Sequence, residues 1–394
     1  MPVQSLRTEL LIIGAGPYGL AASSYAKQAN IDFCLMGRTL DFFENHTPNP
    51  LVMATSYDTA IKDPKRELTL RRYCTLEGIA VESAPGEPTS HFPPRRLFLD
   101  YAHWWMDQIG LSPDPRLVTA LGRQNGGFGA ILEDGSAVEA RRVILATGMY
   151  PHRFIPSLFR ERLPKERYSH NTDAVNLEVF ASKRVLVVGG GLSGVEWAIY
   201  LSQAGAEATC VYRGKWNRME QRFAFTVFKW RDLSETDHLW WQKLTPAERE
   251  QNLHLLKLQH RYGVPQWLRG EEGDVRFLPR TDVVDCKELG GAVQVTLTGG
   301  EKITVDHVIL GTGFRPDIVN LPFLDAKTIV ASLALSDGVP YLDQHFQTSV
   351  PGLYVSSALA ARQFGPLLWF VTGSGIAPAH IFKHILGSNR APAQ

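Results

Sequence analysis

Two glycine-rich segments have the spacing that binds the phosphates of a dinucleotide. Residues 14–19 and residues 189–194 both read G-x-G-x-x-G, and a short apolar run precedes each of them. Glycines at this spacing allow a tight strand-to-helix turn and let a pyrophosphate approach the helix N-terminus. Two such segments in one chain predict two bound dinucleotides and electron transfer between them. The residues expected to contact the nucleotides are Gly14, Gly16, Pro17, Tyr18 and Gly19 in the first segment, and Gly189, Gly191, Leu192, Ser193 and Gly194 in the second.

The end of the strand that follows the second segment indicates which nucleotide binds there. In a dinucleotide-binding fold, a carboxylate at this strand end accepts hydrogen bonds from the adenosine ribose, whereas a basic residue suits a 2′-phosphate. Arg213 and Lys215 occupy this place, with Arg218 close behind and no carboxylate at the strand end. These cations favour NADPH over NADH. A solvated basic turn is the alternative interpretation.

The first segment is assigned to FAD, mainly from its position in the chain. Arg38 follows the strand end where the ribose acid is usual, and it suits either a 2′-phosphate or the adenine or pyrophosphate of FAD. An FAD domain commonly begins at the N-terminus and is completed by C-terminal residues. Near that end, Gly365, Pro366 and Leu367 predict a turn and a helix start beneath the flavin, where backbone N–H groups would stabilise the reduced ring. A simple Gly-Pro turn explains the tripeptide equally well.

Composition is that of an ordinary globular protein. The net charge of +1 gives no long-range reason to bind nucleic acid or an anionic membrane. The apolar runs are far shorter than the ~20 residues needed to span a bilayer, and no secretory segment precedes the first strand. The four cysteines are scattered, with neither a C-x-x-C pair nor metal-like spacing. We therefore expect a cytoplasmic protein with no disulfide and no bound metal.

The elements that must position these residues alternate between short apolar strands and helix-compatible segments. This alternation predicts an α/β fold with doubly wound parallel sheets. We expect two Rossmann-like domains: residues 1–150 and 311–394 bind FAD, and residues 151–310 form an NADPH domain inserted between them. A helical insertion at about 214–273 holds five of the nine tryptophans. These side chains favour the protein core or a subunit interface over a substrate pocket. A subunit interface would make the protein a possible homo-oligomer. The five tryptophans are Trp216, Trp230, Trp240, Trp241 and Trp267.

Two further motifs carry a family resemblance. With the two glycine loops, Ala146-Thr147-Gly148 and the stretch Gly311–Asp317 make the chain similar to the class B flavoprotein monooxygenases. This group holds the flavin-containing monooxygenases, the Baeyer–Villiger enzymes and the N-hydroxylases of lysine and ornithine. The resemblance implies that Gly148, His170, Thr312 and Gly313 lie near the cofactors. The fingerprint that would end at His170 matches only in that histidine, and Ser356-Ser357 replace the ribityl-binding acid of many reductases.

The resemblance implies a reaction carried by the flavin. NADPH would reduce FAD, dioxygen would add to flavin C4a to give a (hydro)peroxyflavin, and a small metabolite would be oxygenated, most readily at nitrogen or sulfur. No nucleophile–base set is then required, and the flavin-face candidates are Met53, Thr55 and Ser56. Two alternatives remain. One is a flavin oxidoreductase that passes electrons from NAD(P)H to a quinone or a protein, and the other is a non-catalytic redox sensor.

Overall fold

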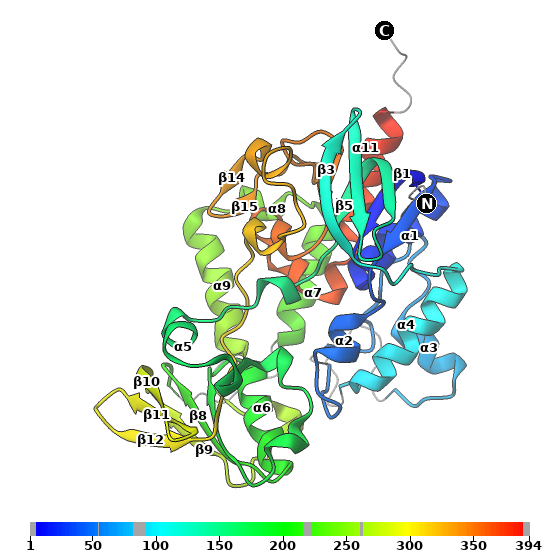
Figure 1. The fold of residues 1–394 in the computed structure, drawn as a ribbon. Helices are drawn as coiled ribbons and strands as arrows, with labels where there is room; N and C mark the ends of the chain where they lie inside the picture. The colour runs from blue at the N-terminus through cyan, green and yellow to red at the C-terminus, as the bar shows by residue number, and fades with distance from the viewer. Residues whose placement is uncertain (1–4, 54, 82–91, 216–222, 261–262, 389–394) are drawn as a thin grey trace.

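The computed structural model describes residues 5–53, 55–81, 92–215, 223–260 and 263–388. Its strands form two main sheets, which lie at opposite ends of the molecule in Figure 1. This arrangement confirms the α/β fold class. The first sheet has the order β2-β1-β5-β4-β3, and the last major strand of the chain, β16, pairs with β5. Its strands are β1 (Ser5–Ile13), β2 (Phe33–Met36), β3 (Val118–Gln124), β4 (Gly127–Leu132), β5 (Ala137–Leu145) and β16 (Leu353–Val355).

Strands from both ends of the chain meet in this first sheet. β1, β2 and β16 run parallel to their neighbours, while β3 and β4 form an antiparallel hairpin beside β5. The apolar run Leu10–Ile13 is buried in the sheet centre, as expected of a parallel strand that is covered on both faces. Consequently the carboxyl ends of β1, β5 and β16 open at one edge, where doubly wound folds bind ligands.

The second sheet is parallel throughout, in the order β6-β13-β7-β8-β9. Helix α6 (Leu192–Gln203) connects β7 to β8 and packs on both strands. A small antiparallel sheet of order β10-β11-β12 adjoins it. The strands are β6 (Tyr168–His170), β7 (Arg184–Val188), β8 (Glu207–Tyr212), β9 (Arg276–Pro279), β10 (Val283–Leu289), β11 (Ala292–Leu297), β12 (Lys302–Val305) and β13 (His307–Leu310). The short pair β14 (Leu335–Ser336) and β15 (Val339–Pro340) lies apart from both.

Helices cover the sheets and connect the two units. In Figure 1, α7 and α9 run between the two sheets, and α11 lies beside α1. The α-helices besides α6 are α1 (Pro17–Gln28), α2 (Asp41–Asn45), α3 (Leu70–Leu76), α4 (Arg95–Ile109), α5 (Ser157–Arg162), α7 (Phe223–Thr236), α8 (Trp240–Lys243), α9 (Pro246–His260), α10 (Ala361–Phe364) and α11 (Ile376–Ser388). Within the described residues, every helix is too short or too polar to cross a bilayer.

The tryptophans of the expected insertion belong to the protein core. Trp230, Trp240 and Trp241 are buried in the hydrophobic cluster of the first sheet, although they lie between strands of the second sheet in the sequence. Trp267 packs instead against the core of the second sheet. Trp216 lies outside the described residues. The expectation that these tryptophans lie in the core is therefore met by Trp230 on α7 and by Trp240 and Trp241 on α8.

Candidate functional site

The first glycine loop combines two tightly packed glycines with one open glycine. A Cβ on Gly14, whose φ is +111°, would overlap the carbonyl oxygen of Ala146, and a Cβ on Gly19 would overlap that of Gly14. At Gly16 a Cβ would meet no atom within 4 Å. The outer two glycines are thus required by the fold, whereas the middle one faces the space that a pyrophosphate would enter.

The second loop repeats this arrangement. A Cβ on Gly189, with φ of +135°, would overlap the carbonyl oxygen of Gly311, and one on Gly194 would overlap that of Gly189. Gly191 again has no atom within 4 Å of its Cβ position. Each loop therefore packs against the residue that follows a neighbouring strand, Ala146 after β5 and Gly311 after β13. This packing explains why the motifs Ala146–Gly148 and Gly311–Asp317 accompany the two glycine loops.

Both loops leave helix N-terminal N–H groups for a ligand. Gly16 is the N-cap of α1 and Gly191 is the N-cap of α6, and neither helix has a side-chain cap. Uncapped N–H groups at the positive end of a helix bind anions. Pro17 occupies the first turn of α1, and Leu192 and Ser193 open α6. The buried Tyr18 is directed elsewhere, since its hydroxyl donates to the Phe370 carbonyl oxygen at 2.9 Å.

Three buried hydroxyl groups fit a polar cofactor beside the first loop. The side-chain oxygens of Thr147, Ser356 and Ser357 are buried and have no hydrogen-bond partner among the described residues. They follow the paired strands β5 and β16. A buried hydroxyl without a partner costs free energy, so a bound polar group is expected there. The hydroxylated ribityl chain of FAD has the chemistry to fill this role.

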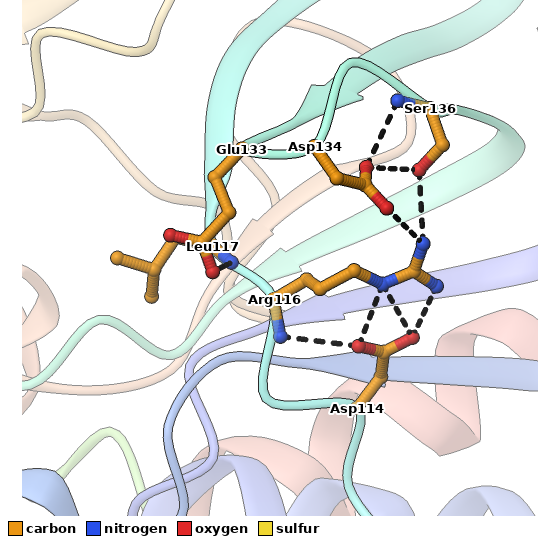
Figure 2. A network of polar contacts seen from close by, with 6 residues as sticks. All are labelled: Asp114, Arg116, Leu117, Glu133, Asp134 and Ser136. Carbon is orange, nitrogen blue, oxygen red and sulfur yellow. Dashed lines mark hydrogen bonds and ion pairs between the residues drawn. The ribbon is translucent and has the colours of Figure 1, made fainter.

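The end of β2 has no free carboxylate. Gly37 donates its N–H to the Asp114 carbonyl oxygen at 2.8 Å. Figure 2 shows that the Asp114 side chain is engaged by Arg116, whose Nε lies 3.0 Å from Oδ1, and that Arg116 also contacts Asp134 at 2.8 Å. The Asp114 carboxylate is therefore paired with a cation. Arg38, two residues after the end of β2, is exposed.

The basic cluster after β8 is exposed. The Arg213 side chain is 81% exposed, and its Nε lies 4.0 Å from the Asp282 carboxylate. Lys215 is exposed as well, and Arg218 lies outside the described residues. The position of Asp282 beside Arg213 was not evident in the sequence, because the two residues are brought together only by the fold. Arg213 is thus a largely exposed cation with one distant ion pair to Asp282.

The flavin-face loop and the C-terminal segment are in contact. Met53 and Ser56 are buried, and the Ser56 Oγ accepts the N–H of Asp58 at 3.1 Å. The hydroxyl of Thr55 is hydrogen-bonded to the hydroxyl of Thr59. The Thr59 hydroxyl in turn lies 3.5 Å from the hydroxyl of Thr372. The fold thus places residues 55–59 against the stretch that follows the predicted flavin-contacting tripeptide.

That tripeptide adopts a turn rather than the start of a long helix. Gly365 has φ of +97°, and a short 3-10 turn covers Pro366–Trp369. Leu367 is buried, and a Cβ on Gly365 would lie 3.3 Å from the ring of Trp241. The longer helix α11 begins only at Ile376. The Trp-rich helices therefore cover this turn from one side.

His170 is held within the protein on both ring nitrogens. Its Nε2 lies 3.1 Å from the Gly313 carbonyl oxygen and its Nδ1 lies 2.8 Å from the Thr172 hydroxyl. A carbonyl can only accept, so Nε2 carries the proton and Nδ1 accepts from Thr172. Burial lowers the pKa of His170 to about 4. Its neutral ring holds Gly313, whose φ is +77°. Gly148, which follows β5 as Gly313 follows β13, also has a positive φ, of +66°. The Thr312 hydroxyl donates to the Phe154 carbonyl oxygen.

Glu196 is a buried carboxyl that motif reasoning missed. It lies on α6 two residues after Gly194, and its Oε1 accepts the indole N–H of Trp267 at 3.1 Å. Burial raises the pKa of Glu196 to about 8. The signal was present in the sequence as a single acid within the apolar run Val195–Leu201. A group with so displaced a pKa beside a nucleotide loop is a functional-site candidate.

Several known proteins resemble this chain over most of its length. An uncharacterized oxidoreductase, CzcO-like, of Geobacillus kaustophilus (strain HTA426) is 28% identical over 88% of this chain and 89% of its own length. The probable indole-3-pyruvate monooxygenase YUCCA8 of Arabidopsis thaliana is 24% identical over 78% of this chain and 75% of its own length. The ornithine N-hydroxylase of Kutzneria sp. 744 has the same fold, with a TM-score of 0.78 and 15% identity over 97% of this chain and 100% of that one.

The family itself follows from a match over most of the chain. The sequence pattern of the family described as pyridine nucleotide-disulphide oxidoreductase covers residues 8–225 and 259–371. Both glycine loops and both late motifs fall inside these ranges. The chain therefore belongs to the pyridine nucleotide-disulphide oxidoreductase family, and it is a flavin-dependent oxidoreductase that uses FAD and a pyridine nucleotide.

Proposed function

We propose that this protein is an NADPH-dependent flavin monooxygenase that oxygenates nitrogen or sulfur in a small metabolite. The observation that carries the proposal is the pair of glycine loops, each with an open middle glycine above an uncapped helix. Residues 1–150 with 311–394 would hold FAD, and residues 151–310 would hold NADPH. The likeness to an ornithine N-hydroxylase and to a monooxygenase of indole-3-pyruvate supports oxygen, rather than a disulfide, as the electron acceptor.

The cysteines of the chain support the same choice. All four lie in the described residues and none forms a disulfide. Burial raises the pKa of Cys210 to about 12 and that of Cys286 to about 11, and it also raises the pKa values of Cys34 and Cys74. Thiol–disulfide exchange requires an accessible thiolate of lowered pKa. No cysteine here has that character.

The residues of the chain would bind and orient the cofactors. When bound, FAD supplies the transfer of electrons from NADPH to dioxygen. The backbone at Gly16 and Gly191 would hold the two pyrophosphates, and Arg213 with Lys215 would bind the 2′-phosphate. The hydroxyls of Ser356 and Ser357 would orient the ribityl chain. Met53, Thr55 and Ser56 would face the flavin ring.

A screen of NADPH consumption tests this proposal. The FAD-loaded protein is mixed with amines, sulfides and ketones, and NADPH oxidation is compared with hydrogen peroxide released. The proposal predicts one amine or sulfide class that accelerates NADPH oxidation with little peroxide. Electron transfer to a quinone with no oxygenated product would favour the flavin oxidoreductase instead. Failure of NADPH to bleach the flavin under anaerobic conditions would favour a redox sensor.

A further inference from the structure

A hollow of about 520 Å³ lies where the chain passes between the two main sheets. One connection follows β5 of the first sheet and leads to β6 of the second, and the other follows β13 and leads back toward β16. The hollow is lined by side chains from residues 153–168 of the first connection and from residues 315–320 of the second. A ligand in this hollow would therefore touch both connections at once.

The two connecting segments are hydrogen-bonded to each other at this place. The N–H of Phe154 donates to the Gly313 carbonyl oxygen at 2.9 Å, and the N–H of Arg315 donates to the His152 carbonyl oxygen at 2.7 Å. An isolated antiparallel bridge joins the same segments. The side chains that line the hollow therefore project from paired backbone, which fixes their relative positions.

Cations predominate among the side chains that line the hollow. Asp317 is the one carboxylate among the described lining residues, and its Oδ1 already accepts the Val319 N–H at 3.0 Å. The positively charged lining residues are Arg153, Arg160, Lys165 and Arg315. The hollow therefore carries an excess of positive charge.

Three of these cations form no ion pair within the described part of the chain. Arg153 is the exception, since its Nε lies 3.7 Å from the Asp173 carboxylate, which is outside the lining of the hollow. Arg160, Lys165 and Arg315 are exposed, and none of them pairs with a carboxylate of the described residues. Direct pairing therefore leaves most of the excess charge unbalanced.

Aromatic rings hold two of the guanidinium groups. The Cζ of Arg315 lies 3.3 Å from the centre of the Phe154 ring, and the Cζ of Arg153 lies 3.6 Å from the centre of the Tyr150 ring. A guanidinium over a ring face keeps its N–H edge free to donate in its own plane. The Nη1 of Arg153 is buried and has no hydrogen-bond partner among the described residues. Because such an unmet donor costs free energy, an acceptor from a ligand is expected beside it.

The hollow has room for more than a bare anion. Its volume falls within the range of about 300–1,000 Å³ that small-molecule sites have. Phe154, Ile155 and Tyr168 add apolar surface to the lining. None of the residues predicted to contact FAD or NADPH belongs to the described lining. A ligand here would therefore be a molecule other than the two cofactors, with an anionic group and an apolar portion.

We propose that this hollow binds an organic phosphate, in which a phosphate ester is joined to a planar apolar portion. A phosphate monoester carries about 1.5 to 2 negative charges at pH 7, so it suits several unpaired cations better than a single carboxylate does. Guanidinium groups bind phosphate oxygens through paired N–H donors, and the Lys165 ammonium adds a further charge. The bound molecule joins the two segments that connect the sheets. This inference goes beyond the proposed function and is the same for any electron acceptor.

Phenyl phosphate, phenol and inorganic phosphate are the probes that test the inference. Each is titrated calorimetrically into the FAD-loaded protein with NADP⁺ in excess, so that both glycine loops are occupied. Phenyl phosphate is expected to bind at least about tenfold more tightly than phenol, and also than inorganic phosphate. The comparison with phenol tests the role of the cations, and the comparison with inorganic phosphate tests the role of the apolar lining.

Matched variants locate the binding in the hollow. Arg160→Gln is expected to weaken the binding of phenyl phosphate by about tenfold, whereas Arg162→Gln, on the same helix α5 but outside the hollow, should leave it unchanged. Lys165→Met should weaken binding several-fold. Lys183→Met should not, although the Lys183 ammonium also lies over an aromatic ring. All four side chains are exposed, so these variants are expected to fold.

Several outcomes would overturn the inference. Equal affinity for phenyl phosphate and phenol would show that the cations play no part. Inorganic phosphate that binds as tightly as phenyl phosphate would identify a site for a bare anion. Equal weakening by Arg160→Gln and Arg162→Gln would place the binding outside the hollow. Tighter binding of a tetraglutamate peptide would indicate a surface for an acidic protein instead. Since no NADPH is oxidised in these titrations, their result is independent of the proposed monooxygenase function.

Discussion

At the scale of single residues, the two loops assign different tasks to glycines of one motif. Gly14, Gly19, Gly189 and Gly194 are required by backbone contacts within the protein, whereas Gly16 and Gly191 face open space. The motif alone identifies all of these positions. Only the three-dimensional packing shows which of them have no room for a side chain and which face open space. The proposal that the open ones admit the ligand can be tested by substitution.

Gly191→Ala is expected to keep the fold and the FAD content while it raises the KM for NADPH at least about tenfold. The added methyl group occupies space that only the pyrophosphate would use. Gly194→Ala, the matched variant, should instead lower the free energy of unfolding by about 1–3 kcal/mol, because its Cβ overlaps backbone. Urea unfolding and steady-state kinetics measure the two effects. Equal loss of stability in both variants would contradict the division of roles.

Arg213→Gln is expected to raise the KM for NADPH by about ten- to a hundredfold and to leave that for NADH unchanged. Loss of a charged hydrogen bond to phosphate costs about 1.5–3 kcal/mol. Arg276→Gln is the control, since Arg276 lies on β9 beside β8 and is also exposed, but its guanidinium is paired with Glu301 at 2.9 Å. Parallel changes for both nucleotides would show that Arg213 does not read the 2′-phosphate.

At the level of residues, the sequence predicts the turn geometry of a motif but not which polar side chains become buried. The loop glycines are identified by spacing alone, since any chain must turn there. The buried hydroxyls of Ser356 and Ser357 could not be recognised as unsatisfied, because their partners depend on distant segments. The pairing of His170 with the Gly313 carbonyl oxygen joins residues far apart in the sequence, so it too was beyond local reasoning.

At the scale of elements, the helices that carry the tryptophans could be predicted from the sequence only in part. Their helical character and their tendency to be buried were predictable from composition. Their packing against the core of the first sheet was not, because α7 and α8 lie between strands of the second sheet in the sequence. Through Trp241, whose indole N–H donates to the Arg362 carbonyl oxygen at 3.2 Å, they hold the Gly365–Leu367 turn.

Trp241→Ala is expected to lower the free energy of unfolding by about 3–5 kcal/mol and to weaken FAD retention. The reason is a cavity left beside Gly365, in the turn predicted to lie under the flavin. Trp369→Ala serves as the control, because Trp369 ends the same turn but is 39% exposed. Chemical denaturation and the ratio of flavin to protein after gel filtration measure both effects. Full FAD retention at unchanged stability would refute this role.

At the scale of the whole molecule, buried ionisable groups set how stability depends on pH. Burial lowers the pKa of His152 and of His170 to about 4 from the ordinary 6.5. Between pH 6.5 and 4 the unfolded chain therefore binds protons that the folded chain does not. The free energy of unfolding is expected to fall by a few kcal/mol as the pH is lowered through this window.

Glu196 acts in the opposite direction. Its pKa is raised from 4.5 to about 8 by burial, so the folded chain retains a proton that the unfolded chain loses above pH 4.5. The contribution of Glu196 to the free energy of unfolding therefore declines as the pH rises from 4.5 to 8, against the rise that the two histidines give below pH 6.5. Above pH 6.5 a net decline is expected, and Glu196→Gln should remove it. Urea unfolding of both proteins at pH 5, 6, 7 and 8 measures the effect. An unchanged slope in the variant would show that Glu196 is ionised in the folded state.

The central claim is that electrons from NADPH activate dioxygen for transfer to a substrate. The most direct test supplies isotopically labelled dioxygen with NADPH and the best substrate from the consumption screen, followed by mass spectrometry of the product. We expect one labelled oxygen atom in each product molecule, formed in step with NADPH oxidation. Label found only in water or hydrogen peroxide would contradict it and would identify the protein as an electron-transferring flavin oxidoreductase.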